Sequence, residues 1–211
     1  MLGSLESAEK VRCGKSFDAG PRTKTYRREC FMTNDIAEIL ITREQLQQKV
    51  EELGKMISQE YRGKNLMIIS VLKGGVMFTT DLIKEITVPL EIDFMAISSY
   101  GHSTSTSGVV RILKDLETDI EGKDILIVED IIDSGLTLEY LKELLLSRGP
   151  QSVKICTILN KPARRKVDVQ VDYKGFDIPD EFVVGYGLDY VEKYRNLPFV
   201  GVLKREIYAE E

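Results

Sequence analysis

The stretch DILIVEDIIDSGLTLEYLKELLLSRGP, residues 124–150, decides the fold of this chain. Its opening residues, 124–130, are mostly apolar and form a run of the length typical of a buried strand. A helix is expected after the turn IIDSG, because Leu138, Leu141, Leu144 and Leu145 line one face and Gly149-Pro150 ends the pattern. A buried strand that leads directly into an amphipathic helix is the repeating unit of α/β folds.

The flanking segments extend this pattern in both directions. Strands are predicted at 66–72, 91–99, 109–114 and 152–159, and shorter ones at 182–186 and 199–203. Helices are predicted after a capping box formed by Thr42 and Gln45, and again after Gly74 and Gly75. Strands that alternate with helices favour a twisted, mostly parallel sheet with helices on both faces.

The composition excludes several classes of protein. The 211 residues carry a net charge of −5, which argues against a general nucleic-acid-binding surface, and no apolar run is long enough to span a membrane. Cys13, Cys30 and Cys156 lack metal-ligand spacing, so we expect free thiols and a cytoplasmic protein. The single histidine, His102, predicts that any bound metal is a hard cation held by carboxylates.

Residues 1–34 differ from the rest, because they carry seven basic and four acidic residues and show no apolar periodicity. We expect a disordered or weakly ordered extension here, with order beginning near Ile36 and one folded domain over 35–211. An expression leader, upstream read-through and a native extension all remain open, and Met32 is an alternative start.

The turn between strand and helix carries the chemistry. Glu129 and Asp130 close the strand, and Asp133, Ser134, Gly135 and Thr137 follow in the turn. Amides at a helix start bind phosphate, and the two acids can accept hydrogen bonds from a ribose diol, directly or through magnesium. A ribose 5-phosphate therefore suits the whole run. The alternative is a capped helix with solvated acids, whereas dinucleotide-binding and P-loop glycine patterns are absent.

The run 128–137 resembles the signature of the phosphoribosyltransferase family, and the chain is most similar to its hypoxanthine-guanine branch. The resemblance covers residues 36–208. Four further segments carry it: LKGG (72–75), SSYG (98–101), Lys161 after ICTILN, and FVVGYGLDYVEKYRNLP (182–198). It implies the type I phosphoribosyltransferase fold with a small base-binding hood.

The resemblance also implies residue roles. Leu72, Lys73 and Gly74 match a pyrophosphate loop with a non-proline cis peptide before the lysine, and Ser99 and Tyr100 match a flexible loop that closes over pyrophosphate. Glu129 and Asp130 match the ribose and magnesium acids, and Asp133 matches the proton acceptor at purine N7. Ser134, Gly135, Leu136 and Thr137 match the 5′-phosphate loop, where some family members have a lysine in place of Leu136.

The resemblance also implies which residues contact the purine base. Lys161 matches the donor to the exocyclic O6, Phe182 the ring stacked on the purine, and Val183 a backbone contact to the base. Asp189 matches the ligand of a second magnesium beside the purine, and Arg195 a pyrophosphate contact. Each has a plainer alternative: surface charges for Lys161, Asp189 and Arg195, a core ring for Phe182. For LKGG the alternative is an ordinary turn, and for residues 102–108 a surface hairpin with a solvent-exposed His102.

The resemblance therefore implies a magnesium-dependent enzyme of purine salvage. It would transfer the phosphoribosyl group of 5-phosphoribosyl 1-diphosphate to N9 of hypoxanthine or guanine, with no nucleic-acid or membrane partner, as a homodimer or homotetramer. The alternatives are a xanthine-preferring enzyme and a catalytically weak regulatory protein of the same fold. The sequence does not rank hypoxanthine, guanine and xanthine.

Overall fold

The computed structural model describes residues 31–99 and 110–209, and Met32–Glu211 form one compact unit. The expectations for residues 1–30 and for the loop 100–108 lie outside the described residues. A short 3-10 helix, Phe31–Asp35, precedes the first strand, so regular structure starts close to the expected Ile36. No helix in the described part of the chain is long and apolar enough to cross a membrane.

The main sheet confirms the predicted α/β architecture. Its six strands lie in the order β4-β3-β2-β5-β6-β7, and only β4 runs antiparallel to its neighbour. The strands are β2 (Leu66–Leu72), β3 (Leu90–Ser99), β4 (Val110–Lys114), β5 (Asp124–Ile132), β6 (Ser152–Asn160) and β7 (Tyr173–Asp177).

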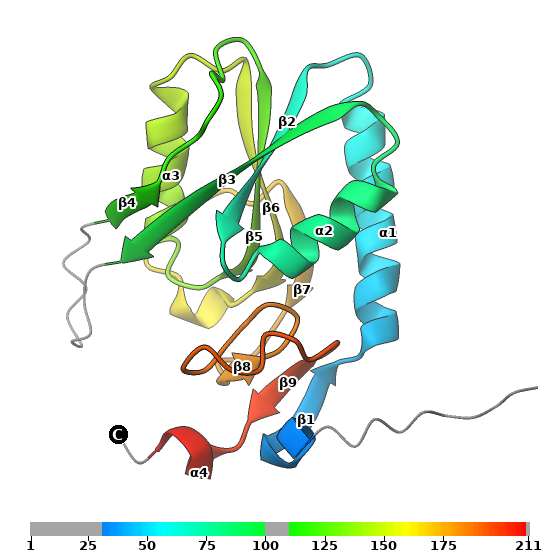
Figure 1. Cartoon of the computed structure of the whole chain (residues 1–211), viewed down its shortest axis with the longest axis vertical. Coiled ribbons are helices and arrows are strands. Elements are labelled where there is room, and N and C mark those ends of the chain that lie inside the picture. The colour runs from blue at the N-terminus through cyan, green and yellow to red at the C-terminus, as the bar shows by residue number, and fades with distance from the viewer. Residues whose placement is uncertain (1–30, 100–109, 210–211) are drawn as a thin grey trace, which may run out of the picture. The chain divides into compact units, whose positions relative to one another are not determined.

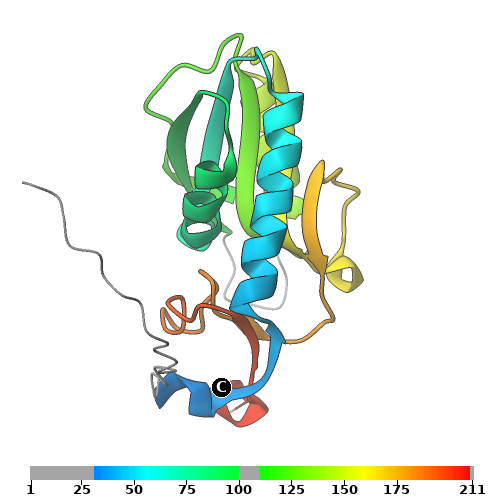
Figure 2. The same ribbon diagram turned by 90° about the vertical axis from the view of Figure 1, so that its right-hand side faces the viewer.

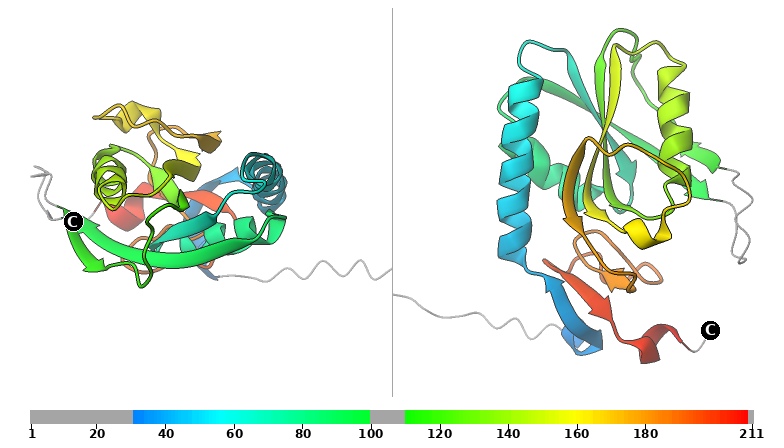
Figure 3. Two further views of the ribbon diagram at one scale, coloured as in Figure 1. Left: turned by 90° about the horizontal axis from the view of Figure 1, so that it is seen from above. Right: turned by 180° about the vertical axis from the view of Figure 1, so that it is seen from behind.

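Helices cover both faces of this sheet (Figures 1 and 3). Since side chains alternate along a strand, Ile68 packs toward α1 (Arg43–Glu60) and α2 (Val76–Glu85), whereas Met67 and Ile69 pack toward α3 (Leu136–Leu146). Leu138, Leu141 and Leu145 of α3 are buried, as their spacing predicts, with Leu144 half-buried beside them. The capping box at Thr42 and Gln45 is present at the start of α1.

A second, three-stranded sheet has the order β1-β9-β8, with β1 (Ile36–Ile41), β8 (Val183–Val184) and β9 (Val200–Leu203). We call these strands, the connecting segment 185–199 and the short helix α4 (Arg205–Tyr208) the hood. Figure 2 shows β1 leading into α1 and lying beside β9, with which it pairs antiparallel. Figure 1 shows the hood below the carboxyl ends of β2 and β5.

Three details differ from the sequence-based expectations. Strand β5 continues to Ile132, so Glu129 and Asp130 lie inside the strand and do not end it. The extension has a physical cause, because β6 pairs with β5 up to Ile132 and Asn160. Strands β1 and β7 do not follow from local patterns: β1 is mostly exposed and is held by a partner strand at the far end of the chain.

Candidate active site

The predicted site segments meet at one edge of the main sheet. LKGG starts at the last residue of β2, the run 129–137 spans the end of β5, and Lys161 directly follows β6. These three strands are neighbours and run parallel, so their carboxyl ends lie side by side. Ligands of open α/β sheets bind at such edges. The hood closes the same edge (Figure 1).

The acid pair of β5 is poorly solvated. Asp130 is only 8% exposed, and its Oδ1 accepts a hydrogen bond of 2.8 Å from the Ile131 amide. Burial raises the pKa of Asp130 to about 6, while burial and the neighbouring charges of Asp130 and Asp133 raise the pKa of Glu129 well above its ordinary value. The Oε2 atom of Glu129 is buried and has no hydrogen-bond partner within the described residues. The charge of Arg195 partly offsets this effect at Asp130, but burial outweighs it.

The predicted pyrophosphate-loop segment packs directly against Asp130 of this pair. The Leu72–Lys73 peptide bond is cis, as the family resemblance implies. A side chain at Gly74 would collide with the carboxylate of Asp130, so only glycine lets the loop approach the acid this closely. Lys73 is exposed, and its Nζ lies 3.0 Å from Oε2 of Glu192 in the hood.

The start of α3 has the form expected of a phosphate-binding turn. Gly135 caps the helix with φ +82°, a conformation that favours glycine, and Leu136 is the first helical residue. The first amides of a helix have no acceptor within it, so they are available to an anion. Ser134 and Thr137 are half-buried at this turn. Asp133 is exposed, and its Oδ1 accepts a hydrogen bond from the Ser134 amide.

Lys161 connects this turn with the segment that leads into the hood. Its backbone amide donates to the Ile132 carbonyl at 2.9 Å, which places it beside Asp133. Its side chain is buried, and Nζ donates to the Glu181 carbonyl at 2.8 Å. Burial lowers the pKa of Lys161. A surface lysine is therefore excluded as the alternative for this residue.

Phe182, the next residue after Glu181, presents a partly open ring at the edge of the hood. It is 38% exposed, which excludes the alternative of a core ring, while Val183 is buried in β8 opposite Val202. Phe182 packs edge-on against Tyr190, with ring centroids 5.7 Å apart, and stacks on Tyr208 of α4.

Asp189 and Arg195 form a pair in the hood segment, with an N–O distance of 2.9 Å. Arg195 also donates to the Gly187 carbonyl at 2.8 Å and lies 3.4 Å from Glu192. The cations predicted to contact pyrophosphate, Lys73 and Arg195, are thus both paired with carboxylates here. Sequence reasoning missed Glu192, Tyr190 and Tyr208, because their contacts link distant segments and no local spacing marks them.

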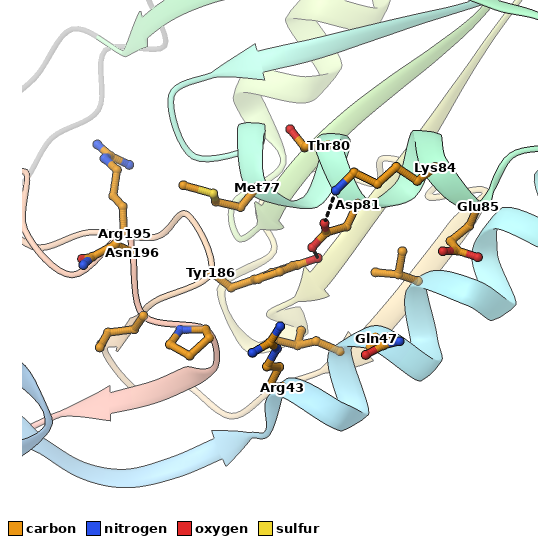
Figure 4. Close-up of a pocket in the computed structure, with 14 residues that line it drawn as sticks. Arg43, Gln47, Met77, Thr80, Asp81, Lys84, Glu85, Tyr186, Arg195 and Asn196 are labelled. Atoms are coloured by element: carbon orange, nitrogen blue, oxygen red, sulfur yellow. Dashed lines mark hydrogen bonds and ion pairs between the residues drawn. The ribbon is translucent and has the colours of Figure 1, made fainter. Parts of the chain in front are cut away.

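The hood is attached to α2 by a hydrogen bond. Figure 4 shows Tyr186 extending toward Asp81, and its hydroxyl donates to Oδ2 of Asp81 at 3.0 Å. A cavity of about 490 Å³ lies beside this contact, between α1, α2 and hood residues up to Pro198, with Arg195 on its wall. The hood segment also touches LKGG itself, since a side chain at Gly187 would collide with the Gly74 carbonyl.

One predicted segment is not tested by this geometry. Ser99 ends β3, whose carboxyl end lies at the same sheet edge as β2, and its side chain is outside the described residues. Tyr100 and His102 also lie outside them.

Comparison with known proteins identifies the family of the chain. Residues 38–191 match the family described as the phosphoribosyl transferase domain. The chain is 56% identical to the hypoxanthine-guanine phosphoribosyltransferase of Bacillus subtilis over 84% of this chain and 98% of that protein. It is similar to the crystal structure of a hypoxanthine phosphoribosyltransferase from Staphylococcus aureus, with a TM-score of 0.84 and 51% identity over 86% of this chain and 98% of that one.

The chain is also 54% identical to part of the bifunctional protein TilS/HprT of Listeria monocytogenes, of which it spans 28% of the length. The matched region includes both the strand end that carries Glu129 and Asp130 and the hood residues up to Val191. The chain belongs to the phosphoribosyl transferase domain family and has its type I fold, a mostly parallel sheet with a hood over the carboxyl ends of the strands.

Proposed function

We propose that this chain is a hypoxanthine-guanine phosphoribosyltransferase of purine salvage, which makes IMP or GMP and diphosphate from 5-phosphoribosyl 1-diphosphate and a 6-oxopurine. One observation carries the proposal. The amide of Lys161 bonds to Ile132 and its Nζ bonds to Glu181, so one residue joins the phosphoribosyl turn to the base-binding segment. The relatives' names support the choice of purine.

The phosphoribosyl half of the substrate would lie at the end of β5. The turn Ser134–Thr137 would hold the 5′-phosphate through backbone amides and the two hydroxyl groups. The presence of Leu136 in place of a lysine should change the affinity for the 5′-phosphate little, because backbone amides make the contact. Glu129 and Asp130 would accept hydrogen bonds from the ribose hydroxyls.

A divalent cation fits the acid pair. Both carboxylates are poorly solvated and Oε2 of Glu129 is buried without a hydrogen-bond partner among the described residues, so a bound cation would have a free carboxylate oxygen to contact. The described residues do not gather three acidic, histidine or cysteine side chains into one metal-binding cluster. That agrees with magnesium, which is commonly held by one or two carboxylates together with substrate phosphates. Asp189 would hold a second ion once its pairing with Arg195 is released. Bound magnesium would neutralise charge that develops on the leaving diphosphate.

The base would lie between Lys161 and Phe182. The Lys161 ammonium donates hydrogen bonds only, so it suits the O6 acceptor of a 6-oxopurine and disfavours the amino group of adenine. The Phe182 ring would stack on the purine and the Val183 backbone would contact its edge. Asp133, exposed beside Lys161, would face N7.

In the reaction, the bond between C1 of the ribose and the diphosphate oxygen breaks as the bond from C1 to purine N9 forms. Asp133 accepts the proton at N7, while Lys73 and Arg195 leave their carboxylate partners to stabilise the departing diphosphate. Closure of the segment that begins at Ser99 and Tyr100 would exclude water, which otherwise hydrolyses the activated sugar.

Two alternatives share this fold. A xanthine-preferring enzyme would give the highest kcat/KM with xanthine, and a regulatory protein would show negligible turnover with tight, sequence-selective nucleic-acid binding. Side-by-side initial rates with purine bases and titrations with DNA and RNA distinguish the three. The net charge of −5 supports the enzyme over a nucleic-acid-binding protein. Cytoplasmic location, a folded domain over 35–211 and assembly as a homodimer or homotetramer stay predictions.

A further inference from the structure

The ring of Phe182 is held from two directions by tyrosines. Tyr208 stacks on it, with ring centroids 4.9 Å apart and an interplanar angle of 24°. Tyr190 meets it edge-on, at 5.7 Å and 89°. Both arrangements are favoured geometries for aromatic pairs. The orientation of the ring is thus defined by two contacts that the predicted site residues do not include.

The hood's own hydrogen bonds bring Tyr208 to this position. The Leu203 amide donates to the Phe182 carbonyl at 2.9 Å, which fixes the end of β9 against the backbone of Phe182. The Lys204 amide donates to the Asp35 carbonyl at 2.9 Å, so the chain is held on its other side as well. The short helix α4 follows, and its last residue, Tyr208, stacks on the ring. Backbone and ring of Phe182 are therefore held by the same C-terminal segment.

The orientation of this ring matters for the base. Lys161 bonds to the carbonyl of Glu181, the residue before Phe182, so the proposed donor to O6 is held against the backbone beside the stacking ring. The plane of a stacked purine follows the plane of the ring on which it lies. A tilt of Phe182 would therefore move the purine edge relative to Lys161 and Asp133.

We propose that Tyr208 is a positioning residue of the purine site, which stacks on the back of the Phe182 ring and leaves its other face to the base. This inference rests on the proposed function, because it assigns Phe182 to purine stacking. It adds to the site a C-terminal residue outside the matched family region, which ends at residue 191.

The direct test compares two substitutions in the full chain. Tyr208→Leu removes the ring and keeps apolar bulk, so KM for hypoxanthine should rise about two- to tenfold, the size of one aromatic pair. The kcat at saturating base and KM for 5-phosphoribosyl 1-diphosphate should stay near those of the unsubstituted chain, which a general loss of structure would not allow. Tyr208→Phe keeps the ring and should restore normal KM. Tyr140→Leu, at an exposed tyrosine on α3, is the matched control.

A spectroscopic experiment covers the case in which Tyr208→Leu does not fold. The chain contains no tryptophan, so Tyr208→Trp introduces a single indole reporter. If residue 208 packs on the face of the Phe182 ring that is turned away from the base, the emission of the introduced tryptophan should keep the wavelength of a half-buried indole when IMP is added. A shift toward the emission of a solvent-exposed indole would mean that the nucleotide displaces it, and this would overturn the proposal.

The kinetic outcomes are equally decisive. An unchanged KM for hypoxanthine in folded Tyr208→Leu removes Tyr208 from base positioning, and a lower KM shows that it competes with the base. Either result leaves the proposed function standing, provided that the unsubstituted chain turns over hypoxanthine. A chain without turnover on any purine would instead contradict the proposed function itself.

Discussion

The end of β5 and the hood place their functional residues in opposite ways. At the end of β5, a regular strand and a regular helix bring Glu129, Asp130 and Asp133 together within one turn of sequence. The hood relies on irregular backbone, with positive φ at four non-glycine residues: Tyr186, Val191, Glu192 and Tyr194. Its contacts join segments as distant as Lys73 and Glu192, or Tyr194 and Asp35.

The difference suits a site whose two regions bind different parts of the substrates. In the proposed site, the phosphoribosyl half needs strong, fixed charges and amides, which a sheet edge and a helix start would supply. The base half needs a shaped surface, which the hood supplies with rings and a few donors. Lys161 and Asp133 lie where the two halves meet, so their substitution should separate the contributions of each half most sharply.

The largest effect is expected at Asp133. Asp133→Asn keeps the size of the side chain and removes its charge, so 5-phosphoribosyl 1-diphosphate should still bind while kcat falls about 10²- to 10⁴-fold. Single-turnover rates and substrate binding would measure both. Asp119→Asn, in a loop at the opposite ends of the strands, should have no effect. An unchanged kcat in Asp133→Asn would remove this residue from the chemistry.

A smaller effect is expected at Lys161. Lys161→Ala removes the proposed donor to O6, so KM for hypoxanthine and guanine should rise with little change in KM for 5-phosphoribosyl 1-diphosphate. A hydrogen bond to a charged group contributes about 1.5–3 kcal/mol, so discrimination against adenine should fall about tenfold to a hundredfold. The exposed Lys55 offers the control Lys55→Ala. If base preference survives in Lys161→Ala, the purine site lies elsewhere.

The acid pair predicts a change in stability that depends on pH. Burial raises the pKa of Asp130 from its ordinary 3.8 to about 6, so its charged form destabilises the folded state. The destabilisation grows as pH rises from about 4 to 6 and is constant above 6. In metal-free buffer at pH 8, Asp130→Asn should therefore stabilise the fold by on the order of 2 kcal/mol and raise Tm by a few degrees. At pH 4 the gain should disappear.

Magnesium should reduce the destabilisation caused by the buried, charged carboxylates in the unsubstituted chain, because it supplies positive charge. Thermal melts with magnesium and with chelator, at both pH values, would measure this. Glu129→Gln should act in the same direction as Asp130→Asn. A lower Tm at pH 8 in both variants would show that the acids stabilise the metal-free fold and would contradict this account of the pair.

The smallest effect is expected from the N-terminal residues. A chain that starts at Met32 keeps Asp35, which accepts hydrogen bonds from Lys204 and Tyr194, and keeps β1. Its Tm and kcat/KM should match those of the full chain. A chain that starts at Arg43 loses β1 and leaves β9 unpaired on one side, so base binding should weaken. Loss of activity already in the Met32 chain would give residues 1–31 a structural role.

Sequence predicted the two regions unequally, for the same physical reason. The strands and helices from Leu66 to Asn160, the capping box at Thr42 and the glycine turn at Gly135 follow from local periodicity and turn chemistry. Strand β1 depends on pairing with β9 about 160 residues away, which no local pattern records. The roles of Lys161 and Phe182 required a resemblance to a family, and the stacking of Tyr208 required the structure.

The central claim is that the sheet edge and the hood form one site for joining a 6-oxopurine to an activated phosphoribose. Initial rates with hypoxanthine, guanine, xanthine and adenine, each with 5-phosphoribosyl 1-diphosphate and with or without magnesium, test it directly. We predict formation of IMP, and of GMP from guanine, only in the presence of the divalent cation, with adenine a poor substrate. Efficient AMP formation without IMP, or equal rates in chelator, would contradict the claim.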